Sequence, residues 1–259
     1  MSVIIPAYHQ ERTIEADLRR ILATLSRWPT GYEVILVVDG ETDGTKREAA
    51  RVRDRHLVIT GYPTNHGKGH AVRFGMAKAR GDVIGFVDAG SDLNPDSLYM
   101  MYEHFKWYNA DIIIGSKRHP VSKVDYPLWR KFLSFGYQTV VRILFGLSIR
   151  DSQVGMKLFR RIVLEDVMPR LLVKEFAFDI EMLAVANHLG YRRIFEAPVE
   201  LKFTGLSNIT SVNFWKIIYK MLWDTAAVFY RLKLLRYYDN SNKRKWIYDP
   251  ELNFQVNIG

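Results

Sequence analysis

The run Val83-Ile84-Gly85-Phe86-Val87 is followed directly by Asp88-Ala89-Gly90-Ser91-Asp92. The apolar run is typical of a buried strand, and carboxylates are costly in a core but not at a strand end that opens to a ligand. Carboxylate oxygens suit Mg²⁺ or Mn²⁺, which usually keep phosphate oxygens in their coordination shell. The stretch therefore indicates a metal and diphosphate site with Asp88 and Asp92 as ligands. The alternative is an acidic turn in which Asp92 or Asn94 caps the next helix.

Strand and helix signals alternate through the first half of the chain. Continuous apolar runs predict strands over residues 3–5, 33–38, 57–59, 83–87 and 111–115. Apolar residues at helical spacing and turn residues predict helices over 11–28, 45–52, 69–80 and 95–108. Solid apolar runs are typical of parallel strands covered on both faces, so we expect an α/β fold with a doubly wound, mostly parallel sheet. Ligands bind beyond the carboxyl ends of such strands, where Pro6-Ala7-Tyr8, Asp39 and Asp88 follow three of these runs.

The positive charge of the chain lies in its second half. The 259 residues have a net charge of +9; residues 1–116 hold 14 basic and 15 acidic side chains, and residues 117–259 hold 23 and 13. A basic half indicates an anionic partner such as nucleic acid, acidic lipid or a phosphorylated substrate, but no nucleic-acid recognition motif is present. The chain has no cysteine, which excludes disulfides, thiolate zinc sites and a cysteine nucleophile.

Amphipathic segments dominate the second half. The pattern predicts one or two amphipathic helices over 126–148, a loop over 151–157 entering a strand at 158–159, a helix over 179–189 and a strand over 194–199. Residues 212–236 combine an apolar face, basic flanks and interspersed Trp and Tyr, which is typical of a helix lying in a membrane surface. The alternative is a helix packed on the core. The residues after Asp239 form either a loose basic tail or a short packed extension.

Neither a signal peptide nor a membrane-spanning helix is expected. The apolar run at residues 2–7 is short and lacks a basic lead, and no stretch of about 18 uncharged apolar residues occurs.

Several motifs occur in order along residues 2–210. They are Val3-Ile4-Ile5-Pro6-Ala7-Tyr8, Asp39-Gly40-Glu41-Thr42-Asp43-Gly44-Thr45, Asn65-His66-Gly67-Lys68-Gly69, Asp88-Ala89-Gly90, Gly115-Ser116-Lys117, Asp151-Ser152-Gln153-Val154-Gly155-Met156-Lys157-Leu158-Phe159 and Phe176-Ala177-Phe178-Asp179-Ile180-Glu181. The ordered set resembles the inverting glycosyltransferases of family 2, and within them the dolichol-phosphate mannose synthase group of dolichyl- and polyprenyl-phosphate hexosyltransferases. This resemblance implies the GT-A fold, a Rossmann-like, mostly parallel sheet flanked by helices, here with C-terminal amphipathic interfacial helices.

The resemblance assigns the nucleotide to the ends of the first two strands. It implies that Pro6 and Tyr8 contact the nucleotide, with Gln10 where a glutamate is usual. It also implies that Val37 and Asp39 contact the base or ribose, since a carboxylate can accept a hydrogen bond from a base N–H. The alternative for Asp39 is an ordinary turn residue.

The glycine-rich loop at 65–69 is not a P-loop, because no Ser or Thr follows Lys68 and the glycine spacing differs. Lys68 and the backbone N–H groups of this loop can still lie near the donor. Ala89, in the metal motif, is also expected to contact the donor. The alternative is a tight turn into a helix.

Three motifs depart from the family pattern. Gly90 stands where the family's Asp-x-Asp has its second acid, while Asp92 occupies the position of a third ligand. An arginine expected after Gly115-Ser116 is replaced by Lys117, with Arg118 next, and the family's Arg-x-x-Gly-x-Ser-Lys begins with Lys202 and ends with Asn208. Lysine keeps the charge but loses the bidentate fork on phosphate, so these changes bear on the identity of the donor.

The implied reaction transfers a hexose, mannose or glucose, from a GDP- or UDP-sugar to a polyprenyl or dolichyl monophosphate with inversion. We expect Mg²⁺ or Mn²⁺ on Asp88 and Asp92 to act on the leaving diphosphate, and Lys117, Arg118 and Lys202 to add positive charge. Residues of the second half are expected on the acceptor side: Arg130 binding the acceptor phosphate, or contacting only lipid headgroups, and Asp151 and Gln153 lining the site.

Two alternatives stay open. One is the same donor chemistry on a saccharide or glycolipid hydroxyl, for which Asp151 or Asp179 would be an essential base. The other is a nucleotide-sugar-binding module without turnover.

The expected organisation is a GT-A domain over 1–210, with a nucleotide-sugar-binding half (1–116) and an acceptor half (117–210). An amphipathic helix and basic tail over 211–259 would hold it peripherally on the cytoplasmic face of a membrane.

Overall fold

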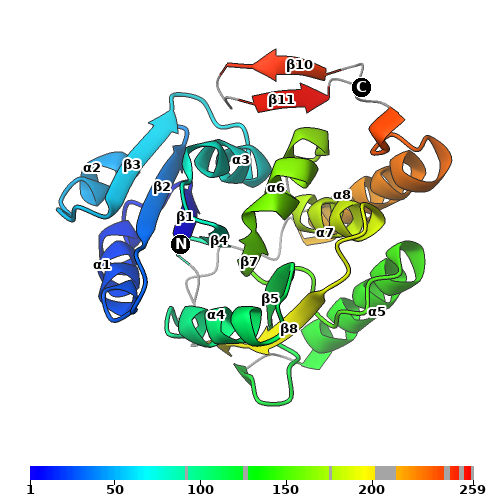
Figure 1. The fold of residues 1–259 in the computed structure, drawn as a ribbon, viewed down its shortest axis with the longest axis horizontal. Coiled ribbons are helices and arrows are strands. Elements are labelled where there is room, and N and C mark those ends of the chain that lie inside the picture. Colours follow the sequence, from blue (N-terminus) through cyan, green and yellow to red (C-terminus); the bar gives the residue numbers. More distant parts are fainter. Residues whose placement is uncertain are drawn as a thin grey trace.

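The computed structural model describes residues 1–90, 93–124, 128–174, 177–201, 214–241, 246–250 and 254–257. Within them, one large sheet carries the core (Figure 1). Its strands, in sheet order, are β3 (Leu57–Tyr62), β2 (Glu33–Asp39), β1 (Ser2–Ala7), β4 (Val83–Val87), β7 (Met156–Arg160), β5 (Ile112–Ser116) and β8 (Ile194–Pro198). All neighbouring pairs are parallel except those of β7, which runs antiparallel to β4 and to β5. The expected mostly parallel α/β sheet is thus confirmed.

Helices cover both faces of this sheet. One face packs against α1 (Ile14–Leu25), α2 (Thr45–Ala49) and α4 (Ser97–Trp107). The other packs against α3 (Lys68–Lys78), α5 (Leu128–Phe145), α6 (Arg161–Val167), α7 (Phe178–His188) and α8 (Phe214–Phe229). Alternate residues of one strand serve the two cores: Ile4 of β1 faces the second group, and Val3 and Ile5 face the first. The continuous apolar runs of the sequence follow from this burial on both faces.

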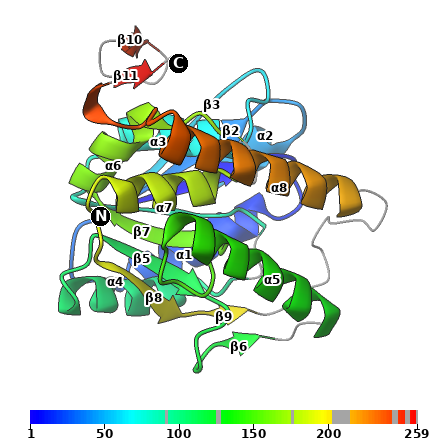
Figure 2. The same ribbon diagram turned by 90° about the vertical axis from the view of Figure 1, so that its right-hand side faces the viewer.

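The remaining elements are short. They are the 3₁₀ turn η1 (Met168–Arg170), the π-helical turn η3 (Tyr230–Leu234), and the strand pairs β6 (Lys123–Val124) with β9 (Glu200–Leu201) and β10 (Trp246–Asp249) with β11 (Phe254–Asn257). Figure 2 shows the two strand pairs at opposite ends of the molecule. The antiparallel pairing of β10 with β11 means that part of the segment after Asp239 is a folded extension. No helix in the described part of the chain is long and apolar enough to cross a membrane.

The segment that follows α8 is hydrogen-bonded to a buried carboxylate of α7. Glu181 of α7 accepts hydrogen bonds from the Tyr238 hydroxyl at 2.6 Å and from Arg231 of η3 at 3.2 Å. Its other oxygen accepts the backbone N–H groups of Leu172 and Val173 at 3.0 and 2.8 Å. One side chain therefore joins the C-terminal segment to the loop that precedes α7.

Candidate active site

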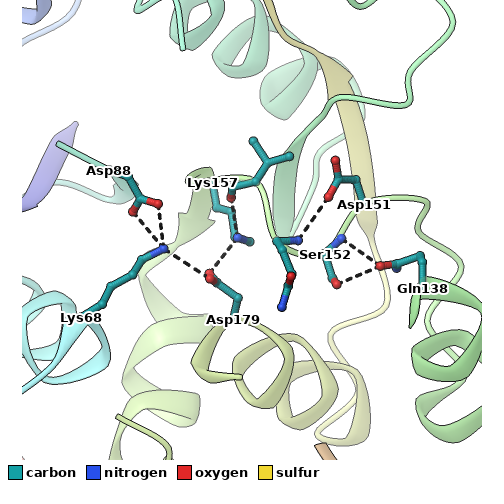
Figure 3. Close-up of polar contacts among 9 residues, drawn as sticks. Lys68, Asp88, Gln138, Asp151, Ser152, Lys157 and Asp179 are labelled. Carbon is teal, nitrogen blue, oxygen red and sulfur yellow. Dashed lines mark hydrogen bonds and ion pairs between the residues drawn. The ribbon is translucent and has the colours of Figure 1, made fainter. Parts of the chain in front are cut away.

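Asp88 lies at the carboxyl end of β4 and forms an ion pair with Lys68. The Lys68 Nζ is 2.8 Å from Oδ1 and 3.0 Å from Oδ2 of Asp88 (Figure 3). The backbone N–H of Asp88 donates to the carbonyl of Gly155 at 2.8 Å. The carboxylate predicted from the sequence is thus at the strand end, held on one side by a lysine and on the other by the loop that leads into β7.

Lys68 bridges two carboxylates that come from different elements. It is the first residue of α3, and its Nζ is also 3.3 Å from Oδ2 of Asp179 at the start of α7. Burial alone would lower the pKa of Lys68, but the negative charges of Asp179 and Asp88 outweigh it and raise that pKa above its usual value. Lys68 is therefore a fixed cation at the centre of the site.

Asp179 has a second cationic partner, Lys157 of β7. The Lys157 side chain is 0% exposed; its Nζ is 2.7 Å from Oδ1 of Asp179 and donates to the carbonyl of Val154 at 2.6 Å. Burial would raise the pKa of Asp179, but the two ammonium groups lower it, so this carboxyl is ionised. Burial lowers the pKa of Lys157, and repulsion from Lys68 adds to this while Asp179 opposes it. Four side chains thus form an alternating line of charge, Asp88–Lys68–Asp179–Lys157, drawn in Figure 3.

Asp39 organises the glycine-rich loop. Its side chain is buried, and Oδ1 accepts the N–H of His66 at 2.8 Å. Oδ2 accepts the N–H of Gly67 at 3.0 Å and the Asn65 amide at 3.1 Å. Gly67 has φ 92°, a backbone conformation that favours glycine, and Lys68 follows directly. Asp39 therefore sets the turn that aims Lys68 at Asp88, whereas its expected contact with the nucleotide stays a prediction.

The remaining donor-side residues differ in exposure. Pro6 and Val37 are register partners in β1 and β2 and are buried in the sheet. Tyr8 is exposed beyond β1 and stacks on His9 with ring centres 4.0 Å apart. Ala89 is half-buried. Of these four predicted residues, Tyr8 is the one that presents a broad open surface to a ligand.

Gln10 occupies the space beside Gly90. A β-carbon added at Gly90 would lie 2.3 Å from Gln10 Oε1, and Gly90 has φ 63°. Gln10 Oε1 accepts a hydrogen bond from Thr13 at 3.1 Å. The glutamine found where the family has a glutamate thus lies beside the position at which a side chain on residue 90 would begin.

The loop 151–155 connects Asp88 to two amphipathic helices. Asp151 is buried and accepts the N–H groups of Lys117 at 3.2 Å and Gln153 at 3.3 Å. The Ser152 hydroxyl donates to Gln138 of α5 at 3.0 Å (Figure 3). The Gln153 amide donates to the sulfur of Met221 of α8 at 3.2 Å. The sequence placed Asp151 and Gln153 on the acceptor side, and the structure brings both to the junction of the sheet with α5 and α8.

Lys117 and Arg118 follow β5. The Arg118 guanidinium carbon lies 5.9 Å from the ring centre of Phe135 on α5. Asp92, Lys202 and Asn208 lie outside the described residues, as does the side chain of Arg130, and their expected roles stay predictions.

The side chains described around Asp88 do not fit a divalent cation as they stand. Mg²⁺ needs near-octahedral oxygen ligation, but both oxygens of Asp88 already contact an ammonium and Gly90 supplies no side chain. No cluster of three His, Asp or Glu in the described ranges could hold a metal. The expected Mg²⁺ or Mn²⁺ on Asp88 and Asp92 stays a prediction that depends on Asp92.

Sequence reasoning did not assign a role to Lys157, and it considered Asp179 only as a base. A lysine inside the apolar strand Met156-Lys157-Leu158-Phe159 is a signal for a buried ion pair, because a buried ammonium requires a partner. Its partner lies 22 residues further on and could not be identified from spacing alone.

A sheet with this strand order and an acidic strand end facing a glycine-rich loop defines a nucleotide-binding α/β protein. The chain belongs to glycosyl transferase family 2, whose sequence model matches residues 2–168. It is 33% identical over 236 residues to a dolichyl-phosphate beta-glucosyltransferase of Drosophila melanogaster, covering 83% of this chain and 70% of the relative. It is 31% identical over 232 residues to the Homo sapiens enzyme of the same name, with coverages of 83% and 70%.

A solved structure confirms the fold. Glucosyl-3-phosphoglycerate synthase from Mycobacterium tuberculosis, in complex with Mn²⁺, UDP-glucose and phosphoglyceric acid, superposes with a TM-score of 0.68. The sequences are 16% identical, and the match covers 88% of this chain and 79% of that one. The expected GT-A fold is therefore confirmed.

Proposed function

We propose that this protein transfers glucose from UDP-glucose to dolichyl or polyprenyl monophosphate, with inversion at the anomeric carbon. The names of the similar relatives support a dolichyl phosphate acceptor, and they favour glucose over the mannose that the sequence resemblance left open. The donor found with the M. tuberculosis synthase supports a uridine nucleotide over a guanosine nucleotide.

The observation that carries this proposal is the pairing of Asp179 with two ammonium groups. Lys157 and Lys68 hold this carboxylate at 2.7 and 3.3 Å and lower its pKa, which makes it a poor base. Asp151, the other candidate base, accepts two backbone N–H groups. A hydroxyl acceptor needs a base, whereas a phosphate monoester is largely anionic near neutral pH, with a second pKa of about 6. The site therefore favours a phosphate acceptor over a saccharide hydroxyl.

The reaction consists of one displacement. A phosphate oxygen of the acceptor attacks C1 of glucose, the bond from C1 to the β-phosphate oxygen breaks, and UDP leaves with that electron pair. Negative charge grows on the leaving diphosphate, and fixed cations aimed at that charge lower the barrier. Lys68 provides such a cation at the carboxyl edge of the sheet, and Lys117 and Arg118 directly follow the carboxyl end of β5.

The acceptor is proposed to reach the site from a membrane surface along α5 and α8. A hydrogen bond of 2.8 Å between Tyr137 and Thr225 joins these helices. Tyr219 and Trp223 of α8 are 69% and 65% exposed and stack on each other, and the second half of the chain is basic. Exposed interfacial aromatics with basic flanks support binding to an anionic leaflet, which is typical of the cytoplasmic face.

A donor and acceptor panel tests the proposal. Purified protein is incubated with radiolabelled UDP-glucose or GDP-mannose and either dolichyl phosphate or a free oligosaccharide, and lipid-linked label is counted. We expect transfer from UDP-glucose to dolichyl phosphate alone. Transfer to the oligosaccharide, or preference for GDP-mannose, would contradict the acceptor or the donor assignment respectively.

A further inference from the structure

We infer that Lys68 is the resident cation of the donor site and binds the donor diphosphate directly, so that UDP binding does not require a divalent metal ion. This inference rests on the proposed function and concerns how the same site neutralises its substrate. In this respect the donor site would differ from that of the solved M. tuberculosis synthase, which is in complex with Mn²⁺.

The position of the Lys68 ammonium favours this role. Lys68 Nζ contacts both oxygens of Asp88 at 2.8 and 3.0 Å, at the end of the strand where the family places its metal motif. A divalent cation bound to either oxygen would lie within a few ångströms of this positive charge and would be repelled by it. The Lys68 side chain is 28% exposed, and a phosphate oxygen approaching the ammonium from that open side, away from Asp88, would be attracted.

The Lys68 ammonium is also held in a fixed position by the residues around it. Asp179 contacts Lys68 at 3.3 Å, and Asp179 is itself anchored by the fully buried Lys157 at 2.7 Å. Asp39 fixes the turn at Gly67 that precedes Lys68. A cation with two carboxylate neighbours and a fixed backbone needs little reorganisation to meet the charge of a leaving group.

The second acid of the family's metal motif is absent from this chain. Position 90 is a glycine, and Gln10 Oε1 would lie 2.3 Å from a β-carbon there. The glycine therefore removes one carboxylate ligand, and the neutral Gln10 amide lies beside it. With Lys68 on the diphosphate, Asp88 can orient the ammonium and accept hydrogen bonds from sugar or ribose hydroxyls.

The test measures UDP binding by calorimetry in EDTA and again in Mg²⁺, without acceptor. Wild-type protein is expected to bind UDP in EDTA with an affinity within about threefold of that in Mg²⁺. Lys68→Met should weaken binding in EDTA by more than about tenfold, and Lys68→Arg should retain most of it. Lys78→Met, at the other end of the same helix, where Nζ lies 4.7 Å from the Phe74 ring centre, is the matched control.

A direct measurement of Mn²⁺ binding can contradict the inference. Mn²⁺ binding is followed by electron paramagnetic resonance in wild type and in a Lys68→Met, Gln10→Ala, Gly90→Asp variant. We expect binding in the triple variant only. The inference is overturned if wild-type protein loses UDP binding in EDTA, binds Mn²⁺, and regains UDP binding when Mn²⁺ is added. This outcome needs only the wild-type protein, so it holds even if every Lys68 variant fails to fold.

The two proposals fail separately. UDP binding that is metal-free and dependent on Lys68, without transfer to dolichyl phosphate, contradicts the proposed function alone. Absence of UDP binding under all conditions contradicts both.

Discussion

Gly155 and Asp88 lie so close that a β-carbon on Gly155 would sit 2.1 Å from Oδ2 of Asp88. The two residues are also joined by the hydrogen bond from the Asp88 N–H to the Gly155 carbonyl at 2.8 Å. The loop that reaches α5 and α8 through Ser152 and Gln153 therefore determines where the Asp88 carboxylate points. Gly155 therefore joins the strand end at Asp88 to the loop that contacts α5 and α8.

Gly155→Ala is expected to displace Asp88 and to lower kcat on the order of a hundredfold, because a small misplacement of a positioned group costs about that much. The measurement is steady-state transfer to dolichyl phosphate, with circular dichroism to check folding. Gly136→Ala is the control, since a β-carbon at this helical glycine meets nothing within 4 Å. A Gly155→Ala protein as active as Gly136→Ala would mean that Asp88 does not need its present position.

Asp179→Asn is expected to destabilise the fold by about 3–5 kcal/mol, because it leaves the ammonium of Lys157 buried without a charged partner. Lys157→Met should cost less, since Asp179 keeps Lys68 at 3.3 Å. The double variant should be more stable than Asp179→Asn alone. Urea unfolding of the four proteins measures the coupling, and additive effects of the two changes would contradict a buried pair.

Because the pKa of Asp179 is lowered in the folded protein, protonation of Asp179 should contribute to the loss of stability in acid. Its pKa is about 3.9 in the unfolded chain and lower in the folded one, so its stabilisation is complete above about pH 4 and is lost as the pH falls through the folded pKa. As the pH falls below about 4, the free energy of unfolding of wild type should therefore fall more steeply than that of the Lys157→Met, Asp179→Asn protein. Parallel pH profiles would show that Asp179 titrates alike in both states.

Trp223→Ser is expected to weaken binding to vesicles of phosphatidylcholine and phosphatidylglycerol by about tenfold, because an inserted indole contributes one to a few kcal/mol. Sedimentation of vesicles with bound protein measures this. Trp107→Ser is matched in chemistry, since Trp107 is 87% exposed but ends α4 on the opposite face of the sheet. Equal losses in the two variants would argue against α8 as the membrane-facing element.

The sequence predicted the elements whose burial is simple. Strands buried on both faces, such as Val83–Val87, leave solid apolar runs, and these appear where expected. The direction of β7 was not predicted, because an apolar run carries no information on which way a strand points. The short helix α6 (Arg161–Val167) also escaped prediction, since seven residues span too few turns for a clear period.

The site was predicted in part for a similar reason. Asp88, Lys68 and Asp151 follow or precede elements whose ends must meet at one edge of the sheet, so their neighbourhood follows from topology. The partners within that neighbourhood do not. That Asp39 would bind the loop before Lys68, and that Gln10 would fill the space at Gly90, depends on side-chain packing between segments distant in the chain.

The reversed strand β7 has one further consequence. Lys157 pairs with Phe86 across the β4–β7 ladder, and its neighbours Met156 and Leu158 turn to the other side of the sheet. A register shift of one residue would place the Lys157 ammonium in the hydrophobic core beneath α1 and α4, away from Asp179. Lys157 thus fixes the register of β7 against β4. Inserting or deleting a single residue in this strand would exchange its two faces and displace the loop 151–155 relative to Asp88.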